Sequence, residues 1–294
     1  MGIEKIDIFP FVLSPSKHNK GFAGQAHMHL KRILSAVVLL PAFLLLVQFG
    51  TPFHFFLLVT LAILVGLHEF YGMAKAGGWH PLTPLGMGSG LALSCMEFLG
   101  APAPWLISAV AGVVVLLLIS LLVGGTEPKE AASRGAITLL GLIYVVGLLS
   151  FPALLRAMVL GRIYIFYLVF VTWAGDTGAF YVGSTMGKRL LCPSISPRKT
   201  VEGSVGGLMC SVLASGLAKF WFWEELGTVE CLVMGIGLGV MGQIGDLCES
   251  MLKRGFGVKD TGALIPGHGG VLDRVDSLLF TGPVLYVAAL AGWV

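Results

Sequence analysis

Long apolar runs separated by short polar breaks dominate this chain. A helix needs about 20 apolar residues to cross about 30 Å of hydrocarbon. On that basis the pattern predicts nine spans, at residues 32–49, 52–75, 83–100, 104–123, 135–155, 163–186, 204–223, 229–248 and 277–294. We therefore predict an all-α, polytopic helical membrane protein with about nine transmembrane helices.

Glycine and proline mark the breaks between these spans, as they do in turns. Examples are Gly50-Thr51-Pro52, Gly77-Gly78 and Gly100-Ala101-Pro102. Two other glycine-rich stretches, 86–90 and 235–239, lie inside spans and follow no strand. They favour close packing between helices over a dinucleotide-binding loop.

Two predicted loops, 187–203 and 249–276, are rich in charge, glycine and proline. Functional residues are common on loops that a rigid scaffold holds in place. We therefore divide the chain into a polar N-terminal extension, residues 1–30, and an integral membrane domain, residues 31–294. These two loops are the candidate active-site loops of that domain.

The composition agrees with a membrane protein. Of the 294 residues, 56% are hydrophobic and 12% are charged, whereas about a quarter of the residues in soluble domains are charged. No basic stretch is interleaved with aromatic residues, so nucleic acid is not an expected partner. The expected surroundings are a lipid bilayer.

The basic residues predict the orientation of the chain, because Lys and Arg concentrate in cytoplasmic loops. With the N-terminus in the cytoplasm, all but three of the 19 basic residues lie on the cytoplasmic side. The exceptions are Arg156, Arg162 and Lys219. We therefore expect a multi-pass protein of the cell membrane, with both charged loops facing the cytoplasm.

Three carboxylates lie inside spans that run from the outer to the inner face: Glu69, Asp176 and Asp246. At about 1.5 Å per residue, Glu69 and Asp246 lie roughly 26 Å from the outer face and Asp176 roughly 20 Å. All three therefore approach the charged loops. Because a carboxylate in a span is costly, each is either part of a site or a structural ion pair. For Glu69 the two alternatives stay open.

The segment from Asp246 onward has the residues of a metal–phosphate site. Asp246, Ser250 and Lys253 share one helix face by their spacing, and Asp273 and Asp276 share another. Three aspartates without a Cys partner favour a hard cation with oxygen ligands, and Mg²⁺ is the natural choice. Clustered Lys and Arg would neutralise transferring phosphates.

The glycine-rich stretch 266–270 cannot form a regular helix and lets backbone amides approach an anion. His268 lies within it and is interpreted as a phosphate or loop hydrogen-bonding residue rather than a metal ligand.

The other loop offers a second anion site. Two hydroxyls and two cations lie within five residues, just before a predicted helix: Ser196, Arg198, Lys199 and Thr200. Such a segment can hold an anion at a helix N-terminus. The alternative is that the cations only enforce orientation and the hydroxyls cap the helix.

Three motifs in these segments resemble the signature of the phosphatidate cytidylyltransferase family, also called CDP-diacylglycerol synthases. They are Ser250-x-Leu252-Lys253-Arg254-x4-Lys259-Asp260-x-Gly262, Pro266-Gly267-His268-Gly269-Gly270 and Leu272-Asp273-Arg274-x-Asp276. Weaker similarity extends to 173–180, 196–203, Lys31-Arg32 and 68–71.

The resemblance implies a reaction, in which CTP and phosphatidic acid give CDP-diacylglycerol and pyrophosphate. It also implies a homodimer, with Mg²⁺ and a second cation such as K⁺, while the compact architecture suggests a bacterial inner membrane. Asp246, Asp273 and Asp276 would then hold the metal, and Lys253 would join them as a catalytic residue. The implied substrate-binding residues are Asp176, Ser196, Arg198, Lys199, Thr200, Glu202, Ser250, Arg254, Lys259, Asp260, His268 and Arg274.

Two alternatives remain open at this stage. One is a cytidylyltransferase for another lipid phosphate, such as an archaeal ether lipid, because acyl-chain contacts are generic apolar surface. The other is an ion-coupled transporter. A transporter predicts polar residues near the bilayer midplane, often in two repeated halves, whereas here they gather at one end of the spans.

Overall fold

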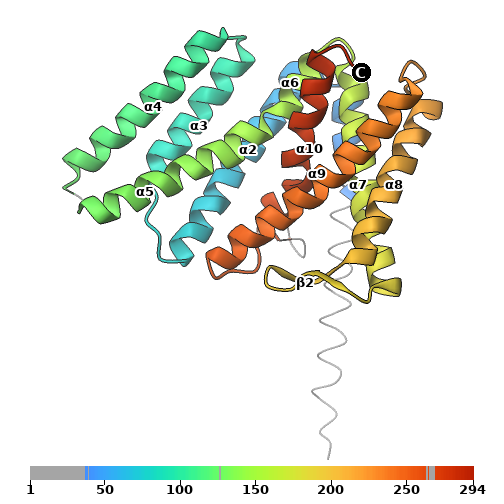
Figure 1. Cartoon of the computed structure of the whole chain (residues 1–294). Coiled ribbons are helices and arrows are strands. Elements are labelled where there is room, and N and C mark those ends of the chain that lie inside the picture. Colours follow the sequence, from blue (N-terminus) through green and yellow to red (C-terminus); the bar gives the residue numbers. More distant parts are fainter. Residues whose placement is uncertain (1–36, 39, 126, 263, 265–268) are drawn as a thin grey trace, which may run out of the picture.

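The computed structural model describes residues 37–38, 40–125, 127–262, 264 and 269–294 (Figure 1). A short apolar helix, Leu40–Phe49, comes first. It is followed by α2 (Pro52–Ala76), α3 (Thr83–Phe98), α4 (Ala103–Val123), α5 (Pro128–Gly141), η1 (Leu142–Gly147), α6 (Phe151–Ala157), α7 (Gly161–Met186), β1 (Leu190–Cys192), β2 (Ser196–Thr200), α8 (Val201–Trp221), α9 (Thr228–Gly255) and α10 (Leu272–Leu290). The predicted extension, residues 1–30, lies outside the described residues.

Most helices begin close to the predicted starts, whereas α5 and α10 begin several residues earlier than predicted. Pro52 is the first residue of α2, and Thr51 caps that helix by accepting the backbone N–H of His54. Proline also lies in the first turn of α3, α4 and α5. Proline suits this position because the first helical N–H groups have no partner inside the helix.

Among the described residues, six helical segments are long and apolar enough to cross a membrane: α2, α4, α7, α8, α9 and the continuous segment Pro128–Ala157. The predicted number of nine is therefore not confirmed. In the first predicted span the structure describes a ten-residue apolar helix, and α3 has only 16 residues. α10 has 19 residues but carries Asp273, Arg274 and Asp276 near its start. The fold is nevertheless that of a multi-pass helical membrane protein.

Close approach of small residues holds α7, α8 and α9 together. A Cβ at Gly175 would lie 2.3 Å from Ser211 Oγ, and one at Gly207 would lie 2.8 Å from Ala179 Cβ. A Cβ added at Gly235 or at Gly239 would likewise come very close to atoms of α8. The prediction that residues 235–239 serve helix packing is therefore confirmed, because larger side chains would push these helices apart.

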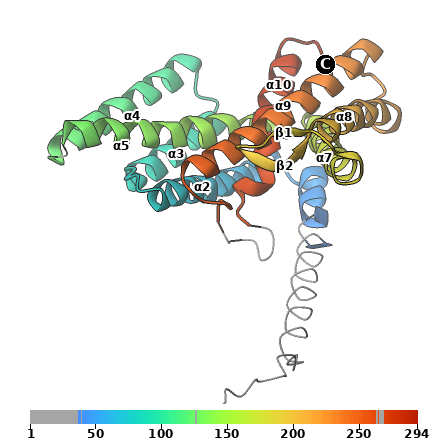
Figure 2. The ribbon, with the colours of Figure 1, turned by 60° about the horizontal axis from the view of Figure 1, so that its bottom comes forward.

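The two candidate active-site loops contain regular structure. α9 continues to Gly255 and α10 begins at Leu272, so both ends of the predicted loop 249–276 are helical. The other loop, 187–203, contains an antiparallel hairpin in which Leu190 pairs with Thr200. Figures 1 and 2 place this hairpin at the end of the molecule where α7 finishes and α8 begins. α2 to α5 extend to the side, away from α7, α8 and the hairpin.

Candidate active site

A cavity of about 540 Å³ lies between α7, α8, α9 and the hairpin. Its lining includes six residues that the sequence singled out: Asp176, Ser196, Arg198, Lys199, Thr200 and Asp246. These residues come from two helices, α7 and α9, and one strand, β2, which are separated in the sequence. The fold thus brings two cations, two hydroxyls and two carboxylates to one space.

The hairpin is held in place by the start of α8. Thr200 ends β2 and also caps α8 by accepting the N–H of Gly203 at 3.1 Å. Glu202, in the first turn, accepts the backbone N–H groups of Lys188 and Arg189 at 3.0 and 3.1 Å. Glu202 was expected to bind substrate, but in this structure it anchors the hairpin and is not among the lining residues of the cavity.

Lys199 brings positive charge to the acidic side of the cavity. Its Nζ lies 2.6 Å from Asp246 Oδ2. This atom is buried, and the ion pair lacks the geometry of a hydrogen bond. A buried ammonium without hydrogen-bonding partners is costly. Lys199 is therefore suited to bind an anion in the cavity.

Asp176, Asp246 and Asp276 form an acidic cluster beside Lys199. Asp176 accepts a hydrogen bond from Ser277 Oγ at 3.2 Å, which joins α7 to α10. α9 and α10 are in contact next to Asp246, since a Cβ at Gly245 would lie 2.6 Å from the carbonyl oxygen of Asp276. All three carboxylates are close enough to interact electrostatically.

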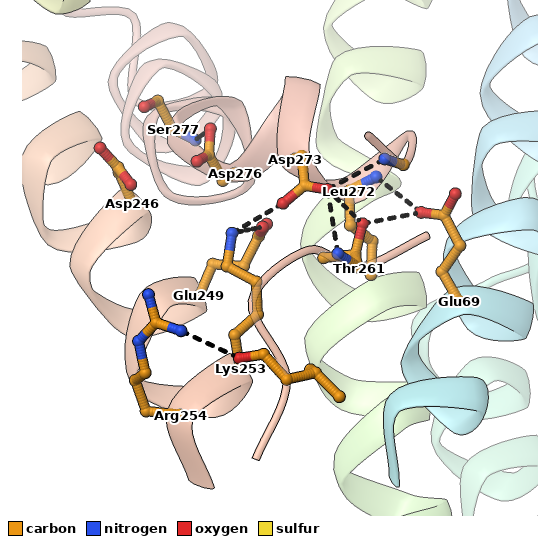
Figure 3. A network of polar contacts seen from close by, with 12 residues as sticks. Glu69, Asp246, Glu249, Lys253, Arg254, Thr261, Leu272, Asp273, Asp276 and Ser277 are labelled. Atoms are coloured by element: carbon orange, nitrogen blue, oxygen red, sulfur yellow. Dashed lines mark hydrogen bonds and ion pairs between the residues drawn. The ribbon is translucent and has the colours of Figure 1, made fainter. Parts of the chain in front are cut away.

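Asp273 belongs to a different group of contacts. Lys253 Nζ lies 2.7 Å from Asp273 Oδ1 and 2.9 Å from Glu249 Oε1. Asp273 Oδ2 accepts hydrogen bonds from the N–H and the hydroxyl of Thr261, at 3.0 and 2.8 Å, and from the N–H of Gly270 at 2.9 Å. Figure 3 shows Lys253 between Glu249 and Asp273. In this structure Asp273 therefore organises the segment between α9 and α10.

The predicted metal-binding trio Asp246, Asp273 and Asp276 is not brought together. Within the described part of the chain, no group of three or more His, Cys, Asp or Glu side chains is placed to hold a metal ion. The i, i+3 spacing put Asp273 and Asp276 on one face, but Lys253, Thr261 and Gly270 occupy the oxygens of Asp273. Two predicted ligands, Asp246 and Asp276, remain next to each other.

Two buried polar atoms beside this acidic cluster have no hydrogen-bonding partner in the described part of the chain: Glu249 Oε2 and the Tyr144 hydroxyl of η1. Tyr144 interacts electrostatically with Glu249 and Asp276. Buried polar groups are normally paired, so these two unpaired oxygens are unusual among the described residues.

Glu69 is a residue of this region whose role the sequence left open. Its carboxylate is buried and accepts the backbone N–H groups of Val271 and Leu272, both at 2.9 Å, and the Thr261 hydroxyl at 3.3 Å. Glu69 therefore caps α10, where a negative charge stabilises the helix N-terminus. Its position in a span was the only sequence signal for this role, because its partners lie about 200 residues away.

The structure gives other contacts or positions to the remaining predicted residues. Arg254 donates to the carbonyl oxygen of Val258 at 3.1 Å. Ser250 is half-buried, and Lys259, Asp260 and Arg274 are exposed. None of these five is among the lining residues of the cavity. His268 lies outside the described residues.

Ser204 and Gln243, which sequence reasoning missed, separate the charged cavity from an apolar groove. The Ser204 hydroxyl hydrogen-bonds Gln243 Oε1, and Gln243 Nε2 donates to the carbonyl oxygen of Ser204 at 2.9 Å. Both residues line the cavity and also a neighbouring groove of about 410 Å³. The apolar residues of that groove are Leu191, Cys192, Val205, Leu208, Val240, Ile244 and Leu247.

Comparisons with known proteins agree with the resemblance found in the sequence. The family model of the cytidylyltransferase family matches residues 30–291. A phosphatidate cytidylyltransferase of Staphylococcus haemolyticus is 36% identical over 263 residues, which is 87% of this chain and 97% of that protein. Proteins of the same name from Bacillus subtilis and Staphylococcus aureus (strain COL) are 47% and 48% identical over 126 and 128 residues, 43% of this chain and 47% and 49% of theirs. The chain belongs to the cytidylyltransferase family.

Proposed function

We propose that this protein is a phosphatidate cytidylyltransferase, which converts CTP and phosphatidic acid to CDP-diacylglycerol and pyrophosphate. The family membership supports cytidylyl transfer, and the names of the relatives support phosphatidic acid as the acceptor.

The observation that carries the proposal is the charged cavity that adjoins an apolar groove across Ser204 and Gln243. A nucleoside triphosphate needs cations around its phosphates, and a phospholipid needs apolar surface next to its phosphate. Arg198 and Lys199 supply the cations. The groove between α8 and α9 supplies the apolar surface, so the two substrates can meet at the shared wall.

In this reaction a phosphate oxygen of phosphatidic acid attacks the α-phosphorus of CTP. A new P–O–P linkage forms, the bond between the α- and β-phosphates breaks, and pyrophosphate leaves with the bonding electron pair. The attacking phosphate is already negatively charged at neutral pH, so it can act as the nucleophile without first losing a proton to the protein. Arg198 and Lys199 would bind the phosphates of CTP and stabilise negative charge as it develops.

The reaction is expected to use Mg²⁺, and the acidic residues fit such an ion. Mg²⁺ is commonly held by one or two carboxylates together with waters and substrate phosphates, so Asp246 and Asp276 suffice on the protein side. A second cation, such as K⁺, would be held by Glu249 Oε2 and the Tyr144 hydroxyl, which have no other partner. When bound, Mg²⁺ would neutralise charge on the transferring phosphates.

We also propose that the active site faces the cytoplasm of a bacterial cell, at the inner membrane. Lys188, Arg189, Arg198 and Lys199 surround the hairpin end of the molecule, in agreement with the positive-inside rule. A homodimer is part of the same proposal.

The decisive experiment uses the purified chain in detergent with labelled CTP, phosphatidic acid and Mg²⁺. We expect lipid-linked CMP and pyrophosphate in equal amounts. Failure to form lipid-linked CMP would contradict the proposal. An ether-linked lipid phosphate, offered in parallel, would identify a different acceptor if it reacted faster than phosphatidic acid.

A further inference from the structure

A second group of cavities lies between α2, α3 and the segment Pro128–Ala157. A cavity of about 330 Å³ is lined mainly by Leu, Val and Ile side chains of α3, α4, α5 and η1. A smaller cavity of about 90 Å³ lies between α2, α3 and α6. Glu97 and Ser150 line both, so the two cavities meet at these residues.

These cavities are far from the candidate active site. Gly77 lies between α2 and α3 and is close to the end of α9. A Cβ added at Gly77 would lie 2.9 Å from the carbonyl oxygen of Phe256. Glu97 follows the start of α3 by 14 residues, which is roughly 21 Å along a helix axis. Figure 1 shows α3 running away from the end that carries the hairpin. The cavities therefore belong to the opposite end of the bundle.

The smaller cavity contains polar groups within a mostly apolar lining. Its lining includes Thr60, Ser94, Glu97 and Ser150. The side chains of Glu97 and Ser150 hydrogen-bond to each other. Thr60 is only 8% exposed, and its hydroxyl has no hydrogen-bonding partner among the residues that the structure describes. An ionisable residue among membrane helices is a functional-site candidate, and the unpaired Thr60 hydroxyl is a second, independent sign of a polar binding site.

The charges of the lining decide which ligand fits. The described lining residues of both cavities include one carboxylate, three hydroxyls and no Lys, Arg or His. Glu97 would repel a phosphate head group, and no cation is present to compensate. A ligand hydroxyl, in contrast, can donate to Glu97 and accept from Thr60 at the same time. The larger cavity offers apolar surface for a hydrocarbon chain.

From this arrangement we infer that the protein has a second lipid site, which binds a neutral amphiphile with a hydroxyl head group, of the monoacylglycerol class. The hydroxyl head lies in the small cavity between Thr60 and Glu97, and the chain lies in the cavity between α3, α4 and η1. The π-helical η1 forms part of the wall, and such segments are frequent at functional sites. This site is separate from the one proposed for phosphatidic acid.

The test compares three amphiphiles by native mass spectrometry of the purified full chain in detergent. The probes are 1-monooleoylglycerol, methyl oleate, which lacks a hydroxyl, and 1-oleoyl lysophosphatidic acid, which carries a phosphate. We expect saturable binding of one monooleoylglycerol per chain, and at least roughly tenfold weaker binding of methyl oleate. Equal binding of the two would overturn the inference, as would displacement of monooleoylglycerol by lysophosphatidic acid at equal concentration.

Variants locate the site. Val110→Trp places a large side chain in the larger cavity, whereas Val115→Trp makes the same change on α4 outside both cavities. Thr60→Val removes the hydroxyl with little change in shape. We expect Val110→Trp to abolish monooleoylglycerol binding and Thr60→Val to weaken it roughly tenfold, while Val115→Trp binds as the wild type. Wild-type binding in Val110→Trp would contradict the assignment, and the comparison of the three probes on the wild type stands even if a variant fails to fold.

Discussion

Glu69 Oε2 accepts a hydrogen bond from the backbone N–H of Leu272 at 2.9 Å, which joins residues 203 positions apart. Glu69 Oε1 accepts the N–H of Val271 at the same distance. A carboxylate of α2 therefore fixes the start of α10, the helix that carries Asp273 and Asp276 (Figure 3). The positions of Asp273 and Asp276 depend in this way on a helix outside the α7–α10 bundle.

We expect Glu69→Gln to lower kcat for cytidylyl transfer by roughly tenfold, with little change in KM for CTP. The amide presents an N–H₂ group to one of the two backbone N–H donors, which leaves a buried donor unpaired at a cost of about 1–3 kcal/mol. Steady-state kinetics and thermal unfolding in detergent measure both effects. Glu225→Gln, at an exposed position, is the matched control. Wild-type kcat in Glu69→Gln would show that α10 keeps its position without this contact.

Lys199→Met should raise KM for CTP roughly tenfold or more, because the cavity loses a buried cation that lies 2.6 Å from Asp246. Lys188→Met, at an exposed position outside the cavity, makes the same change nearby. Initial rates over a range of CTP concentrations distinguish the two variants. An equal KM for CTP in both would indicate that Lys199 serves the hairpin or the orientation of the chain only.

Asp246→Asn and Asp276→Asn should each lower activity at least roughly 100-fold, while the protein still inserts and folds. Each substitution removes one of the two carboxylates proposed to share Mg²⁺ with the substrate phosphates. Activity is measured as a function of Mg²⁺ concentration, and folding is followed by size-exclusion chromatography and thermal unfolding. Near-normal turnover in both variants would remove these residues from the metal site.

Lys253 and Asp273 are predicted to be coupled in stability. Their side chains are only 13% and 11% exposed, and removing one member of a buried ion pair costs about 3–5 kcal/mol because the other charge stays buried. Lys253→Met, Asp273→Asn and the double variant form a cycle that unfolding in detergent can measure. We expect the double variant to lose clearly less stability than the sum of the single losses. Additive losses would mean that the two side chains act independently.

Leu208→Trp should raise KM for phosphatidic acid and leave KM for CTP unchanged. Leu208 lines the apolar groove beside Ser204 and Gln243, so a larger side chain would obstruct a lipid chain there. Leu217→Trp is the control, since it makes the same change at an exposed position on the same helix. Kinetics with each substrate varied in mixed micelles test this prediction. An equal change in both variants would exclude the groove as the lipid-chain site.

The sequence by itself determined the class of fold and the family. Apolar runs and their Gly and Pro breaks are local features, so they predicted the helices and most of their starting points. The signature from Ser250 to Asp276 is also a continuous pattern, and family comparison agrees with it. Close helix packing at 235–239 was predictable for the same reason, because only small residues permit it.

Only the tertiary structure decided how the polar residues are grouped. Spacing placed Asp273 and Asp276 on one helix face, yet Asp273 contacts Lys253 and Thr261 while Asp276 lies with Asp176 and Asp246. Glu202 and Glu69 likewise bind backbone N–H groups that local pattern does not reveal. The physical reason is that a carboxylate takes whichever donors the folded chain brings within hydrogen-bonding distance. Those donors come from other helices, and the sequence does not state which helices are neighbours.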